Sequence, residues 1–172
     1  MELAGQGFKL RPFRPGDERA LVRYGNNRAV WINLTDVFPH PYTFEDAERW
    51  TAIANDAPAD QLNFAIDIGG EAVGSVGFSR RTDLRRRTAE IGYWLGEPFW
   101  GRGIAAAALL LATRVAFEHY DFVRLQAGIL SWNPRSMRVA EKAGYHLEGT
   151  QRNAGFKDGK VCDLVMYVML RP

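Results

Sequence analysis

The stretch most suggestive of chemistry is EPFWGRGIAAAALLL at 97–111, where two glycines flank an arginine and an apolar run follows. A glycine-containing loop that opens a helix gathers unpaired backbone N–H groups, and the helix dipole adds positive potential there. Helix starts usually carry an acidic residue or a Ser, Thr or Asp cap that satisfies these groups. No acidic residue lies between Pro98 and Phe117. The pattern therefore predicts a bound phosphate at the loop; a plain glycine turn before a buried helix is the alternative.

Two common phosphate-binding motifs fit this loop poorly. A P-loop requires Gly-Lys-Ser/Thr after the glycines, and this sequence is missing. A dinucleotide fingerprint is met formally by Gly101, Gly103 and Ala106, with Asp121 at the spacing of the ribose-binding acid. That acid should end the next strand, whereas Asp121 precedes the strand predicted at 122–130. The sequence therefore disfavours a dinucleotide-dependent oxidoreductase.

The elements that must position the loop alternate between strands and helices. Apolar periodicity and turn residues predict helices over 15–27, 42–56, 103–119 and 133–144. Thr43 and Asp46 form a capping-box pattern, and Asn133 is a predicted helix cap. Strands are predicted at 8–13, 63–68, 72–80, 88–95, 122–130, 145–152 and 160–170. No repeat or linker interrupts this order, so we expect one α/β domain over 1–172.

Composition narrows the class of protein. The 172 residues are 47% hydrophobic and 24% charged, which are values of a globular domain. A net charge of +2 is too small to argue for nucleic acid or an anionic membrane. Cys162 is the single cysteine, which is typical of a reducing compartment. No segment has the length of a signal peptide or membrane span. Three scattered histidines and one cysteine give no metal-ligand spacing. We therefore expect a cytoplasmic protein without a metal.

The segment AEIGYWLGEPFWGRGIAAAAL at 89–109 resembles the acetyl-CoA-binding segment of the GNAT N-acetyltransferases. Their pyrophosphate loop, Q/R-x-x-G-x-G/A, is matched from Trp100 to Ala105, with Trp100 in place of the usual Gln or Arg. Segments 39–50, 133–149 and 157–170 are similar to the RimJ/RimL branch, the ribosomal-protein N-terminal acetyltransferases. The similarity spans nearly the whole chain in the same order.

This resemblance implies the GNAT fold, a mixed and mostly antiparallel central sheet with about four flanking helices. Its fourth and fifth strands, here 88–95 and 122–130, splay apart and admit the pantetheine arm of acetyl-CoA. The resemblance places Asn133 and Ser136 near the thioester, although Asn133 could equally be only a helix cap and Ser136 only a first-turn residue. The other implied acetyl-CoA-binding residues are Tyr93, Trp94, Leu95, Trp100, Gly101, Arg102, Gly103, Ile104 and Ala105.

Acetyl transfer to an amine requires a neutral amine, a polarised thioester carbonyl and a tolerable leaving thiolate. An α-amine has a pKa of about 7.7–8.0 and a lysine amine about 10.4, so an N-terminal acceptor needs much less help from a base. The thiol, with a pKa of about 8.5, leaves more easily if a general acid assists. A backbone N–H polarises the carbonyl best, and Leu95 is the predicted donor.

The residues for proton transfer depart from the family's usual pattern. The position of the family's tyrosine acid is Ala140 here, and the position of the glutamate found in some RimL-like members is Gly155. Glu90 is the predicted base, acting through water; the alternative is that Glu90 is an exposed strand residue without a catalytic role. Ser136 is the predicted proton donor, and Asp163 is a weaker candidate for a positioning group.

We expect an acetyl-CoA-dependent N-acetyltransferase whose acceptor is a protein N-terminus. A small amine such as a polyamine or aminoglycoside, or a non-catalytic acyl-CoA-binding module, remains open. An aromatic acceptor region is predicted around Trp31, Phe38, Tyr42 and Trp50. The arginine hairpin, Arg80 to Arg87, is either a solvated turn or a docking patch for an acidic partner or ribosomal RNA. The sequence leaves the oligomeric state open, and a homodimer is compatible with it.

Overall fold

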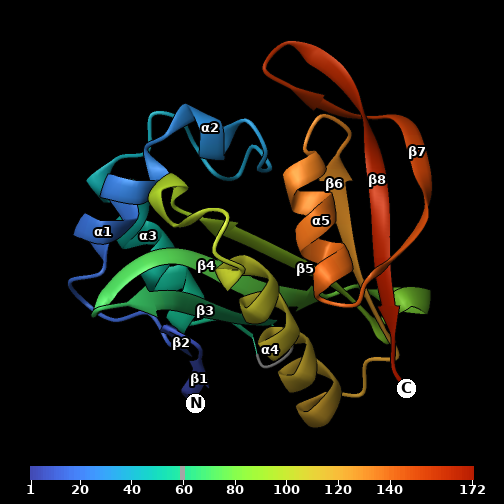
Figure 1. Ribbon diagram of the computed structural model, residues 1–172, viewed down its shortest axis with the longest axis horizontal. Coiled ribbons are helices and arrows are strands. Elements are labelled where there is room, and N and C mark those ends of the chain that lie inside the picture. Colours follow the sequence, from blue (N-terminus) through green and yellow to red (C-terminus); the bar gives the residue numbers. More distant parts are fainter. Residues whose placement is uncertain (59–60) are drawn as a thin grey trace.

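The part of the chain that the structure describes, residues 1–58 and 61–172 of a computed structural model, contains one eight-stranded sheet (Figure 1). The strand order is β1-β2-β3-β4-β5-β6-β8-β7. Within these residues the neighbouring strands are antiparallel, apart from the parallel pair β5 and β6. The strands are β1 Leu3–Gly5, β2 Phe8–Arg11, β3 Gln61–Ile68, β4 Glu71–Arg80, β5 Thr88–Leu95, β6 Arg124–Leu130, β7 His146–Lys157 and β8 Lys160–Leu170.

Helices cover both faces of the sheet (Figure 1). On one face α1 and α3 enclose a small core that includes Phe13, Leu21 and Ala65. On the other face α4 packs over β4 and β5, with α5 beside it, and the larger core lies there. The described helices are α1 Glu18–Gly25, α2 Arg28–Trp31, α3 Phe44–Asn55, α4 Ile104–His119 and α5 Pro134–Lys142, with the 3-10 turns η1 Asp83–Arg85 and η2 Glu97–Phe99.

The sheet opens between β5 and β6. These strands pair only from Thr88 with Arg124 to Glu90 with Gln126. Beyond that point β5 continues along β4 as far as Leu95, and β6 continues along β8 as far as Leu130. Each strand follows its antiparallel partner, so the two diverge and leave a V-shaped opening, as the sequence predicted for strands 88–95 and 122–130.

The predicted order of elements is confirmed, with two additions. The three-residue strand β1 is too short to show alternation and forms by folding back on β2 through Gly7, whose φ is 77°. The four-residue helix α2 starts at Asn27, whose side chain accepts a hydrogen bond from the N–H of Ala29. The capping box of α3, from Thr43 and Asp46, is present as predicted.

A buried ion-pair network fixes the N-terminal part of the sheet. The Arg11 side chain donates to Asp17 at 2.7 and 2.8 Å and to Asp67 at 2.6 Å, which joins β2, the start of α1 and β3. Burial alone would raise the pKa of Asp67, but hydrogen bonds from Arg11 and the N–H of Gly70, with the charge of Arg11, hold it below its ordinary value.

We expect Asp17→Ala to lower the free energy of unfolding by about 3–5 kcal/mol, because the Arg11 guanidinium stays buried after it has lost one of its carboxylate partners. Urea denaturation measures this loss. The matched control is Arg23→Ala, which breaks the exposed Arg23–Glu71 pair and should cost less than about 1 kcal/mol. Equal losses in the two variants would contradict the structural role of the buried network.

Candidate active site

Strand β5 presents alternate side chains to the two faces of the sheet. Trp94 points to the α3 face, where its ring contacts Phe38 at a centroid distance of 5.4 Å. Ile91 and Leu95 belong to the core beneath α4. By the same alternation Glu90 and Gly92 share the face of Trp94, and Tyr93 shares the face of Leu95. One strand therefore contributes to sites on both sides of the sheet.

The backbone of β5 also alternates between its two neighbours. Gly96 N–H donates to the carbonyl of Val73 at 2.8 Å, so the even-numbered residues of β5 pair with β4. The N–H and C=O groups of Tyr93 and Leu95 consequently face the opening, where β6 has diverged. The Leu95 N–H, predicted to polarise a carbonyl, is thus directed into the opening. The backbone N–H and C=O groups of Trp94 point toward Ser75 of β4, and its indole lies at the opening.

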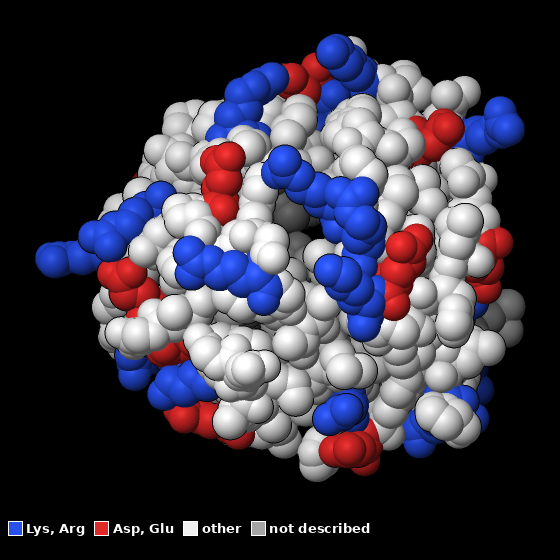
Figure 2. All heavy atoms as spheres, viewed as in Figure 1, with Lys and Arg blue, Asp and Glu red and all other residues white. Residues whose placement is uncertain are grey.

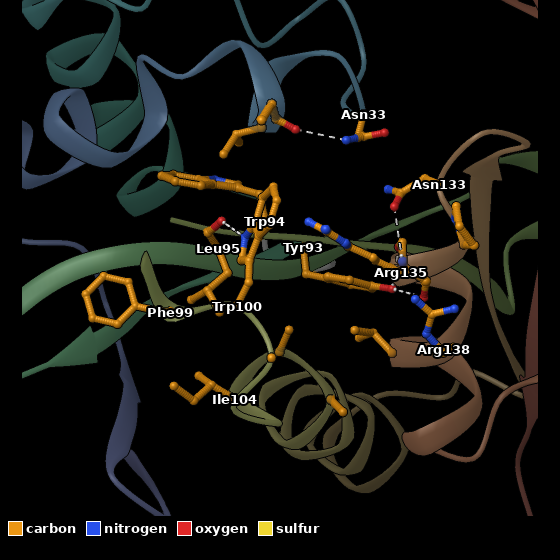
Figure 3. Close-up of a pocket in the computed structure, with 18 of the residues that line it drawn as sticks. Asn33, Tyr93, Trp94, Leu95, Phe99, Trp100, Ile104, Asn133, Arg135 and Arg138 are labelled. Atoms are coloured by element: carbon orange, nitrogen blue, oxygen red, sulfur yellow. Dashed lines mark hydrogen bonds between the residues drawn. The ribbon is translucent and has the colours of Figure 1, made fainter. Parts of the chain in front are cut away.

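On the α4 face a cavity of about 610 Å³, the donor cavity, lies over the end of β5 (Figure 3). Its walls come from α2 and the following residues, β5, the glycine loop, the first turn of α4, and α5. Among the predicted site residues that line it are Tyr93, Trp94, Leu95, Trp100, Gly101, Gly103, Ile104, Ala105, Asn133 and Ser136.

The start of α4 has the geometry of an anion site. Gly101 and Gly103 have φ values of 78° and 77°, in the left-handed region that favours glycine. A Cβ at either position would meet no described atom within 4 Å, so the space above the loop is open. Among the described residues no side chain caps this helix, and its first turn has no acidic residue. The free N–H groups of the first turn are therefore left for a ligand.

The side chains of Trp100 and Arg102, in the glycine loop, each contact a neighbouring residue. The Trp100 indole N–H donates to the carbonyl of Leu95 at 2.6 Å, which ties the loop to the end of β5 (Figure 3). A tryptophan can thus replace the family's usual Gln or Arg at this position. The Arg102 guanidinium lies over the ring of Phe99 at 5.6 Å, and Arg102 is not among the residues that line the cavity.

Asn133, Ser136 and Tyr93 form a connected group at the opening (Figure 3). The Asn133 side chain accepts from the Ser136 N–H at 3.1 Å, which makes Asn133 the cap of α5. The Tyr93 hydroxyl lies 2.8 Å from the Ser136 Oγ and 3.0 Å from its carbonyl oxygen. Burial raises the pKa of Tyr93 to about 12 and outweighs the hydrogen bond to Ser136. The phenol is therefore neutral at physiological pH.

Sequence reasoning missed the Tyr93 side chain and a row of cations on α5. Arg135, Arg138 and Lys142 all line the donor cavity. Their i, i+3, i+7 spacing places them on one face of the helix, a signal that the sequence already contained. Figure 2 shows Lys and Arg side chains around the hollow on this face of the molecule. Their charge makes the donor cavity suited to a polyanion.

A second cavity of about 740 Å³, the acceptor cavity, lies on the α3 face. Phe38, Tyr42 and Trp50, three of the four aromatic residues that the sequence analysis assigned to an acceptor region, line it. Trp31 instead stacks on His40, with ring centroids 5.3 Å apart. The two cavities adjoin each other, because they share six lining residues: Asn33, Leu34, Tyr93, Trp94, Asn133 and Ser136.

The predicted proton-transfer residues lie in different surroundings. Glu90 lines the acceptor cavity, and its Oε2 accepts from Gln126 at 3.0 Å and lies 3.9 Å from the Arg81 Nε. Asp163 accepts from the Asn153 N–H at 2.8 Å, which holds a bulge of β7. A Cβ at Gly155 would meet the Cys162 sulfur at 2.6 Å, so packing favours glycine at this position.

Residues 1–58 and 61–172 contain no group of three or more His, Cys, Asp or Glu side chains placed to hold a metal ion. None of their helices is long and apolar enough to cross a membrane.

An uncapped helix start beside a cation-lined cavity favours an anionic ligand, and a second cavity adjoins the first. Comparison with known proteins specifies the family. The family model described as acetyltransferase (GNAT) domain matches residues 8–146, so the chain belongs to the GNAT acetyltransferase family. The predicted family and activity class are confirmed.

Individual relatives differ in their acceptors. The ribosomal-protein-serine acetyltransferase of Escherichia coli is 33% identical over 107 residues, which cover 62% of this chain and 59% of that protein. The spermidine N(1)-acetyltransferase of the same organism is 24% identical over 159 residues, 91% of this chain and 82% of that protein. A solved structure of RimL, a ribosomal L7/L12 α-N-protein acetyltransferase in complex with coenzyme A, superimposes with a TM-score of 0.83. That match has 21% identity and covers 99% of this chain and 98% of the other; it confirms the predicted GNAT fold.

Proposed function

We propose that the protein transfers the acetyl group of acetyl-CoA to a primary amine, namely the α-amine of a protein N-terminus, by direct attack in a ternary complex. The observation that carries this proposal is that two cavities, one on each face of the sheet, adjoin at shared lining residues. Tyr93, Trp94, Asn133 and Ser136 line both, so a donor on the α4 face and an acceptor on the α3 face can meet between β5 and β6.

The lining of the donor cavity supports acetyl-CoA as its ligand. The N–H groups from Gly101 to Ala105 would bind the pyrophosphate, and Arg135, Arg138 and Lys142 supply cations for its phosphates. The outward-facing backbone groups of Tyr93 would pair with the pantetheine amides. The Leu95 N–H would then stabilise negative charge on the thioester oxygen.

The chemistry is acyl transfer with proton transfer on each side. The amine nitrogen bonds to the acetyl carbon, the carbon–sulfur bond breaks, and the amine loses a proton. Glu90 is on the acceptor face and would take that proton through water. Ser136 and Tyr93 share hydroxyl hydrogen bonds on the donor face and would donate to the leaving sulfur. Base and donor thus lie on the sides of the sheet where the reaction needs them.

Proton chemistry also favours an α-amine as acceptor. Glu90 stands at the last paired rung of β5 and β6 before the opening, and its carboxylate contacts Gln126 and Arg81. An α-amine, with a pKa of about 7.7–8.0, needs little help from such a base to lose its proton, whereas a lysine amine near 10.4 needs much more. The alternative acceptor, a small amine such as a polyamine, is supported by the similarity to the spermidine acetyltransferase.

The experiment that tests the proposed function uses labelled acetyl-CoA and three acceptors: a peptide with a free N-terminus, the same peptide N-blocked but containing lysine, and spermidine. We expect acetylation of the free N-terminus with kcat/KM at least tenfold above the other two. Preference for spermidine would make a polyamine the acceptor. Tight CoA binding with no acetylation of any amine would favour a binding module without turnover.

We expect Gly103→Glu to weaken CoA binding at least a hundredfold, because a carboxylate would stand where the pyrophosphate binds. Isothermal titration with CoA measures the affinity. The matched control is Gly7→Glu, since Gly7 also has φ 77° and open space around its Cβ, but lies in the β1–β2 turn. Both variants should lose similar stability, and only Gly103→Glu should lose CoA. Wild-type affinity in Gly103→Glu would refute the anion site.

We expect Glu90→Gln to lower kcat/KM at least tenfold and to change its pH profile, since the amide cannot accept the amine proton. Steady-state rates across pH 6–9 measure this effect, with CoA affinity as a check on the donor side. Glu48→Gln, on an exposed part of α3, is the control and should behave as wild type. An unchanged pH profile in Glu90→Gln would remove Glu90 from the mechanism.

A further inference from the structure

The acceptor cavity has a floor of small residues drawn from three adjacent strands. Ser75, Gly77 and Ser79 of β4 line it, with Gly92 of β5 and Gly128 of β6. Gly77 and Gly92 are directly paired across the two strands. A Cβ on Gly92 would meet no described atom within 4 Å. The floor is therefore bare backbone at Gly92, whereas a Cβ on Gly77 would meet the Asn63 Oδ1 at 2.3 Å.

This floor leads from the opening of the sheet to the arginine hairpin. Ser79 and Glu90, which both line the cavity, form a cross-strand pair. At the next rung the Arg81 N–H donates to the Thr88 carbonyl, and the hairpin begins. Figure 1 shows this turn at the end of β4 and β5 opposite to the loop that leads into α4. The Arg81 side chain follows Ser79 on the same face and approaches Glu90.

The hairpin end of the floor is cationic. Segment 80–87 contains five arginines and one acidic residue. Arg87 hydrogen-bonds to the Asp121 carbonyl, whereas Arg85 and Arg86 are exposed and ion-pair with no carboxylate in the described part of the chain. At the tip, Leu84 is 89% exposed. The two carboxylates lining the acceptor cavity, Asp46 and Glu90, already have partners in Thr43 and Gln126.

We propose that the acceptor is an extended polypeptide with acidic residues from about its fifth position onward, which contact the arginine hairpin while its N-terminus reaches the opening. This rests on the proposed function. From Gly92 to Thr88 is four residues, or about 13 Å at about 3.3 Å per residue. An extended acceptor rises by the same amount, so its first four residues cover the floor. A polyamine would instead bring its positive charges toward arginines, which the same electrostatics disfavour.

Three eight-residue peptides test this inference. They share four uncharged residues and a free N-terminus, and positions 5–8 are acidic, neutral or lysine. We expect kcat/KM to fall from the acidic to the neutral to the lysine peptide, with at least a tenfold difference between the extremes. The difference should shrink as salt rises from 20 to 300 mM, because exposed charges are screened.

The variant Arg85→Glu/Arg86→Glu should abolish or reverse the preference for the acidic peptide. Arg19→Glu/Arg114→Glu makes the same change in net charge at exposed positions of α1 and α4, and should keep the wild-type ratio. Equal kcat/KM for the three peptides, or an unchanged ratio in the hairpin variant, overturns the inference. So does loss of binding to an RNA oligonucleotide by the hairpin variant without any effect of peptide charge. Failure to acetylate any peptide, whatever its charge, overturns the proposed function itself.

Discussion

The site depends on one constraint of strand pairing. β5 keeps its antiparallel partner β4 to the end, whereas β6 follows β8, so the pairing between β5 and β6 stops at Glu90 and Gln126. The outward-facing N–H and C=O groups of Tyr93 and the N–H of Leu95 are then left without a strand, whereas the Leu95 carbonyl accepts from the Trp100 indole. Unpaired backbone groups inside a sheet are costly unless a partner supplies hydrogen bonds. The opening is thus prepared for a ligand that pairs like a strand, which suits the amide-containing arm of CoA.

The same strand separates the charges that the reaction needs. Because side chains alternate along β5, Tyr93 and Leu95 belong to the donor face and Glu90 and Trp94 to the acceptor face. The donor face has an uncapped helix start and a row of cations, both suited to phosphates. The acceptor face combines aromatic walls with a glycine-rich floor. The two faces of the sheet thus differ in chemistry, although Tyr93, Trp94, Asn133 and Ser136 line both cavities.

Local hydrogen bonds fix the loops around the opening. The Trp100 indole holds the glycine loop to the Leu95 carbonyl, and the Asn133 cap fixes the first turn of α5. The cap positions Ser136, whose hydroxyl then meets Tyr93. Asn133 is therefore a helix cap in this structure, and any contact it makes with the donor would be an additional role. A structural role and a proposed catalytic role meet in the same few residues.

The sequence by itself determined the order of the main elements, the uncapped anion-binding start of α4, the caps of α3 and α5, and the resemblance to the GNAT family. Each of these depends on residues close together in the chain or on a motif of fixed spacing. The short elements β1 and α2 were absent from the sequence prediction because they lack a periodic pattern and form through contacts with neighbours. Only the tertiary structure decided that Tyr93 meets Ser136, that the α5 cations face the donor cavity, and that a floor of glycines ends at the arginine hairpin. Such contacts join residues distant in the chain, and they are set by strand register and helix packing, which local spacing does not encode.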